Sequence, residues 1–100
     1  MKKERGNTME LTESVKNLLT SCITELIDNP DDLAVDVKKV DDDSANEGYT
    51  VSADIKVNPE DVGKVIGRQG RTIKSLRTLA RALGAKQGIR VEVEIIEEDK

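Results

Sequence analysis

The residues best suited to chemistry form a four-residue loop, Gly67-Arg68-Gln69-Gly70. The two glycines lack a Cβ atom, so they permit a sharp turn and let the backbone of a ligand come close. The amides that open the following helix point outward and favour an anion. Arg68 places a positive charge between the glycines. Together these features are typical of a site that binds a phosphate group.

Positive charge is concentrated around this loop, although the chain as a whole carries a formal net charge of −4. Residues 62–90 contain 8 basic side chains and no acidic one. By contrast, residues 1–61 contain 7 basic and 15 acidic side chains, and residues 91–100 contain 1 basic and 5 acidic ones. Because a ligand meets the local field rather than the net charge, this distribution predicts a polyanionic partner for the loop.

Two helices are expected to position the loop. The first is short and starts at Asn58-Pro59-Glu60-Asp61, where a capping Asn precedes a Pro and two carboxylates. The second has an apolar stripe made of Ile73, Leu76, Leu79, Ala80 and Leu83. Its basic residues fall broadly opposite that stripe, and they are Arg71, Lys74, Arg77 and Arg81. We therefore expect a basic ridge that extends the phosphate track away from the loop.

The rest of the chain predicts one helix and three strands in a single domain. Apolar residues at helical spacing over 11–27 indicate a helix that ends at Asn29-Pro30. Alternating patterns predict strands over 33–37, 49–57 and 89–95, with a bulge or an end at Lys39-Val40. We expect an α+β fold of order α-β-β-α-α-β, whose three-stranded sheet carries three helices on one face. The expected organisation is a flexible tail at 1–8, the domain at 9–96 and an acidic tail at 97–100.

The run Val65-Ile66-Gly67-Arg68-Gln69-Gly70-Arg71-Thr72-Ile73, set after a capped short helix in this element order, resembles the KH domain in its type II arrangement. Within that fold, the longer run 58–74 and the compact length resemble the small stand-alone bacterial KH proteins of the KhpA family. The resemblance covers about residues 10–96. It implies a single-stranded RNA-binding protein that acts as a small post-transcriptional regulator or RNA chaperone.

The resemblance also implies roles for particular residues. The residues Gly67, Arg68, Gln69 and Gly70 would clamp the nucleic-acid backbone, as KH loops do across about four nucleotides. Further contacts would come from Arg71, Lys74 and Lys64. Bases would lie in an aliphatic groove, for which the candidates are Val65, Ile66 and Ile73, all of which also suit a hydrophobic core. Self-association, or pairing with a larger KH protein of the Jag type, is the partnership that the resemblance implies.

Other kinds of site have little support. With no His and with Cys22 as the single cysteine, the chain lacks a Cys/His zinc set and a Ser-His-Asp triad, and we expect no cofactor, no metal and no enzymatic activity. The carboxylates at 41–43 are expected to form a solvated turn, and Cys22 to be a small buried hydrophobe. No apolar run approaches membrane-spanning length, so we expect a cytoplasmic protein. The alternative function is a protein-interaction subunit with incidental RNA contact.

Overall fold

The computed structural model describes residues 8–41 and 49–97, and the side chains of residues 11–40 and 50–97. The helices are α1 (Thr8–Thr24), α2 (Val62–Ile66) and α3 (Arg71–Ala85), and the strands are β1 (Ala34–Asp41), β2 (Tyr49–Lys56) and β3 (Arg90–Ile95). Three single 3-10 turns complete the described elements: η1 (Pro30–Asp32), η2 (Pro59–Asp61) and η3 (Arg68–Gly70). The predicted α+β class and the order α-β-β-α-α-β are confirmed.

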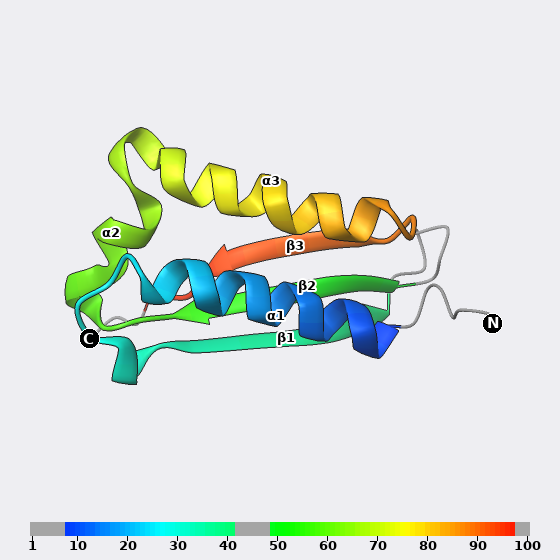
Figure 1. The fold of residues 1–100 in the computed structure, drawn as a ribbon, viewed down its shortest axis with the longest axis horizontal. Helices are drawn as coiled ribbons and strands as arrows, with labels where there is room; N and C mark the ends of the chain where they lie inside the picture. Colours follow the sequence, from blue (N-terminus) through cyan, green and yellow to red (C-terminus); the bar gives the residue numbers. More distant parts are fainter. Residues whose placement is uncertain (1–7, 42–48, 98–100) are drawn as a thin grey trace.

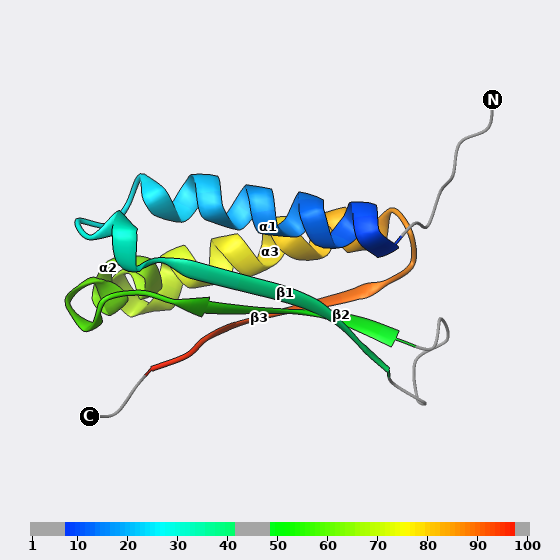
Figure 2. The same cartoon turned by 90° about the horizontal axis from the view of Figure 1, so that it is seen from below.

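The three strands form one mixed sheet in the order β1-β2-β3. β1 and β2 pair as an antiparallel hairpin, and β3 runs parallel to β2. Helices α1 and α3 lie side by side over one face of this sheet, which gives two layers (Figure 1, Figure 2). The central strand is β2, so β1 and β3 are edge strands.

The core lies between the two layers and is aliphatic. Helix α1 contributes buried side chains at four-residue spacing, namely Leu11, Val15, Leu19 and Ile23. Helix α3 contributes Ile73, Leu76 and Ala80, and the sheet contributes alternate residues such as Val51, Ala53, Ile55, Val91 and Val93. These periods of four and two are those of a helix and a strand that each bury one face. The buried positions of α3 leave its opposite side free to carry the basic residues.

The short helix α2 lies at the end of the helical layer, next to the start of α3 (Figure 1). Its start is capped as predicted, because the Asn58 side chain accepts a hydrogen bond from the Glu60 amide at 2.8 Å. The cap is followed by the 3-10 turn η2, after which α2 runs for five residues only. The chain then turns through Gly67 and enters α3, so the loop is held between two helix ends.

Three details differ from the sequence predictions. Helix α1 ends at Thr24 rather than at Asn29, because the chain tightens into a turn in which the amide of Leu26 bonds to Ile23 at 2.8 Å. Strand β1 continues through Lys39 without a bulge, so Val40 points to the open face of the sheet and is 41% exposed.

The third difference is Leu79, which is 48% exposed and does not belong to the apolar stripe of α3. The predicted tails at 1–8 and 97–100 fall almost entirely outside the described residues, as do two of the carboxylates expected in a solvated turn at 41–43, while Asp41 is the last residue of β1.

Candidate functional site

The backbone of the predicted loop has a conformation that requires its glycines. Gly67 has φ 80° and ψ 173°, a combination that is essentially restricted to glycine. A Cβ atom at Gly67 would overlap the Thr72 side chain and would lie 2.9 Å from the Thr72 amide nitrogen. Gly70 has φ 75° and ψ 16°, in the left-handed region, and a Cβ there would meet no atom within 4 Å. The first glycine is therefore needed for space and for its dihedral angles, and the second for its dihedral angles alone.

The two residues between the glycines are exposed and point away from the core. Gln69 is the one residue other than glycine with a positive φ, 58°, among the residues that the structure describes. Its side-chain oxygen accepts a hydrogen bond from Nη2 of Arg71 at 3.0 Å. Because α3 starts at Arg71, its first free amides and its positive dipole end lie directly after the loop. The arrangement gathers backbone donors and two guanidinium groups, those of Arg68 and Arg71, at one exposed turn.

The predicted basic ridge continues along α3. Lys74 and Arg81 are exposed, and Arg77 is half-buried. The Nε atom of Arg77 donates a hydrogen bond to the carbonyl oxygen of Val93 at 3.1 Å. Since Val93 belongs to the edge strand β3, this bond places Arg77, in the middle of the ridge, at the open edge of the sheet. A polyanion bound at the loop would therefore find positive charge along the boundary between α3 and β3.

The three aliphatic candidates for base contact have different surroundings. Val65 and Ile73 are buried within the hydrophobic core, where they pack rather than face solvent. Ile66 packs against the same core and remains half-buried. Of the three, Ile66 is the residue that a ligand can reach without a rearrangement of the core.

Lys64, another predicted contact, forms ion pairs within the chain. Its Nζ atom lies 3.3 Å from Asp28 Oδ2 and 3.4 Å from Asp61 Oδ1. Asp61 is fully buried and accepts three hydrogen bonds: from the Asp28 amide at 3.1 Å, and from the amide and side-chain nitrogens of Asn29 at 2.9 and 3.1 Å. This cluster fastens the segment after α1 to the start of α2. Sequence reasoning placed Asp61 in a helix-start signal but could not identify partners 32 and 33 residues away.

The cluster shifts the pKa values of two of its members. Burial raises the pKa of Asp61, but hydrogen bonds from Asp28, Asn29 and Lys64 outweigh it, so the pKa lies below its usual value of 3.8. The hydrogen bond with Asp28 and the negative charge of that residue raise the pKa of Lys64 above its usual value of 10.5, with a further contribution from Asp61. Both groups are therefore charged at neutral pH.

These shifts predict how stability depends on acid. The folded-state pKa of Asp61 is lowered, so its ionised carboxylate contributes fully to the free energy of unfolding above pH 3.8. This contribution is lost as the pH falls through the folded-state pKa. We expect Asp61→Asn to be less stable than the native chain at neutral pH, and the difference to shrink below about pH 4. Urea unfolding at several pH values measures this, with Glu60→Gln as an exposed control. A difference that stays constant down to about pH 2 would contradict the assignment.

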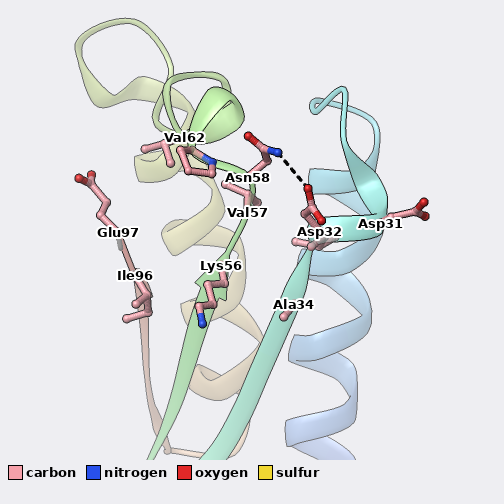
Figure 3. A pocket seen from close by; sticks show the side chains of 11 residues that line it. Asp31, Asp32, Ala34, Lys56, Val57, Asn58, Val62, Ile96 and Glu97 are labelled. Carbon is pink, nitrogen blue, oxygen red and sulfur yellow. Dashed lines mark hydrogen bonds between the residues drawn. The ribbon is translucent and has the colours of Figure 1, made fainter. Parts of the chain in front are cut away.

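A hollow of about 750 Å³ lies at the end of the sheet where β1 begins and β2 and β3 end (Figure 3). Its charged lining consists of Asp31, Asp32, Glu97 and Lys56. The Asp32 carboxylate accepts a hydrogen bond from Asn58 at 2.9 Å. Three carboxylates against one ammonium group repel phosphate, so this hollow is unsuited to a polyanion.

Over residues 8–41 and 49–97, no group of three or more His, Cys, Asp and Glu side chains is placed to hold a metal ion. Within the same residues, no helix has the length and apolar character needed to cross a membrane. Cys22 is free and half-buried, packed against the core.

The fold is similar to part of a solved structure. In the crystal structure of Era from Aquifex aeolicus, the matching part covers 88% of this chain and 32% of that chain, with a TM-score of 0.58. Sequence identity over this match is 18%, so the likeness concerns the fold alone.

Sequence comparison identifies the family. The family model described as KhpA/KhpB, KH domain, matches residues 16–95. RNA-binding protein KhpA of Halalkalibacterium halodurans is 41% identical over 83 residues, which are 83% of this chain and 100% of that protein. RNA-binding protein KhpA of Leifsonia xyli subsp. xyli is 44% identical over 75 residues, which are 75% of this chain and 90% of that protein. With its type II KH fold and its matches over most of its length, the chain belongs to the KhpA/KhpB family of KH domains.

Proposed function

We propose that this protein binds single-stranded RNA and that the Gly67–Gly70 loop clamps the phosphate backbone. The observation that carries the proposal is the loop geometry: two glycines with positive φ bring Arg68 and the first amides of α3 to one exposed turn. Relatives that are 41% and 44% identical are named RNA-binding proteins. The role is one of binding without catalysis, as a small post-transcriptional regulator or RNA chaperone.

The proposed contacts follow from the accessibility of each side chain. Arg68, Arg71 and Lys74 are exposed and would each neutralise a phosphate. Ile66 would contact a base at the rim of the core, and Gln69 would position Arg71 through their hydrogen bond. Lys64 would reach RNA only by leaving its ion pairs with Asp28 and Asp61, so we expect it to contribute less than the other three cations.

The test is a titration of fluorescently labelled, random-sequence single-stranded RNA with the native chain, read by anisotropy at several salt concentrations. Three phosphate contacts predict that the logarithm of the binding constant falls with the logarithm of salt concentration with a slope of about −2, since each contact on a single strand contributes about −0.7. A slope near zero, or no binding even at low salt, would overturn the proposal.

A second candidate function, protein interaction, is favoured by Leu79. This side chain is 48% exposed on α3, and a contact with another protein would remove its apolar surface from water. We propose that α3 also takes part in self-association or in pairing with a larger KH protein of the Jag type. Such pairing would bring two loops together and raise avidity without a new RNA contact.

The effect of Leu79 can be measured by light scattering. We expect the Leu79→Glu variant to be more monomeric than the native chain, both alone and in a mixture with a Jag-type protein. The reason is that the contact would bury the new charge. Val40→Glu is the matched control, since Val40 is 41% exposed on the opposite, open face of the sheet. A native chain that is strictly monomeric and ignores the partner would eliminate this candidate.

A further inference from the structure

A second hollow lies at the far end of the basic ridge. It has a volume of about 460 Å³ and lies between the last turns of α3 and the start of β3. Its lining consists of Arg81, Ala85, Ile89, Arg90, Val91 and Glu92. The lining therefore combines apolar side chains with two guanidinium groups, one from the helix and one from the strand.

The charges in this hollow favour an anion. Arg90 is paired with Glu92 at 3.6 Å, but both side chains are more than half exposed, so solvent weakens the pair. Arg81 is exposed and adds a second positive charge. Together with the negative charge of Glu92, the side chains of the lining sum to one positive charge, which exceeds the partial negative charge of about half a unit at the end of α3.

The hollow and the Gly67–Gly70 loop lie at opposite ends of α3, as Figure 1 shows for the turns at the two ends of the helix. Eleven residues separate Gly70 from Arg81, which corresponds to about 16 Å at 1.5 Å per residue. Stacked nucleotides rise by about 3.4 Å each, so the separation equals about five nucleotides. Between the two ends lie Lys74 and Arg77, and Arg77 is held at the β3 edge by its bond to Val93.

We propose that the hollow between Arg81 and Arg90 is a second RNA subsite, which takes a nucleotide about five positions along the strand from the loop. The proposal rests on the RNA binding proposed above and extends the footprint beyond the four or so nucleotides that a KH loop clamps. The plane of one arginine and the exposed Ala85 support a base, while the other guanidinium binds its phosphate. Glu92 can accept a hydrogen bond from a base amino group.

The experiment compares RNA lengths. Labelled random-sequence RNAs of about 5 and about 10 nucleotides are titrated with the native chain and with Arg81→Gln/Arg90→Gln. For a loop that clamps about four nucleotides, the longer RNA has about fourfold more registers, so the native chain should prefer it by clearly more than about fourfold, on the order of 30-fold. In the variant the preference should fall to about fourfold, while the affinity for the short RNA stays unchanged. The control Lys16→Gln/Lys38→Gln removes two exposed positive charges elsewhere and should keep the native preference.

Each outcome decides between the proposals. A variant that keeps the full preference for the longer RNA overturns the second subsite but leaves RNA binding at the loop intact. A variant whose affinity for the short RNA also falls overturns the second subsite as well, because Arg81 and Arg90 would then act at the loop. A native chain that binds neither RNA overturns the proposed function itself. The single variant Arg81→Gln changes an exposed position of α3 and should lose part of the preference for the longer RNA. It controls for an effect of the Arg90 substitution in β3 on folding.

Discussion

Replacing Arg68 and Gln69 together by aspartate is expected to weaken the binding of single-stranded RNA by at least about tenfold, with the fold unchanged. The change removes one positive charge and adds two negative charges at the proposed phosphate clamp, and three exposed charge units are together worth about 1.5–2 kcal/mol. Both side chains are exposed, and both glycines are kept. Aspartate tolerates the left-handed conformation of residue 69, where φ is 58°, and it lies favourably near the start of α3.

The control for this variant carries the same change of charge elsewhere. Lys16→Glu/Asn17→Glu alters two exposed residues of α1 by three charge units in total and uses a residue that suits a helix interior. Anisotropy with labelled RNA gives the two affinities, and circular dichroism with urea unfolding checks that both variants fold. If the control loses as much affinity as the loop variant, the effect comes from net charge and the clamp is refuted.

The two glycines of the loop are expected to differ sharply in their tolerance of a side chain. Gly67→Ala should destabilise the fold by about 3 kcal/mol, because it combines a backbone conformation that costs about 1–3 kcal/mol with an overlap against Thr72. Gly70→Ala should cost about 1 kcal/mol or less, because its left-handed conformation is strained while its surroundings are open and the unfolded chain loses freedom.

Urea unfolding of the two alanine variants measures this difference. RNA binding should follow the same order, because Gly67 sets the entry of the chain into the clamp. A substitution at Gly67 is a poor test of RNA contact, because its effect on folding would mask its effect on binding. Equal destabilisation by the two substitutions would show that the backbone at Gly67 is not under the constraint described here.

Much of the site could be predicted from the sequence because its determinants are local. Glycine spacing, the Asn58 cap and the run of cations after Gly67 each depend on residues close together in the chain, and all are found where the pattern places them. The type II KH fold followed from element order and the same motif, and the family comparison confirmed it.

What the sequence did not predict depends on contacts between distant segments. Lys64 was grouped with the RNA-binding cations by its position, but only the folded chain brings Asp28 and buried Asp61 beside its ammonium group. Leu79 fits a helical apolar stripe within the tolerance of the pattern, yet it is 48% exposed in the folded chain. Val40 breaks the alternation of apolar and polar residues in β1, yet it stays in the strand because it pairs in regular register with Thr50 of β2.

The central claim, that RNA is bound by the loop and the ridge of α3, is tested most directly by titrating the ¹⁵N-labelled native chain with single-stranded RNA and following each backbone amide by NMR. We expect the largest shifts at residues 66–74, with further shifts along the α3 side of the β3 edge. Shifts concentrated instead on the open face of the sheet, around Asp54 and Glu94, or in the acidic hollow around Asp32, would contradict it.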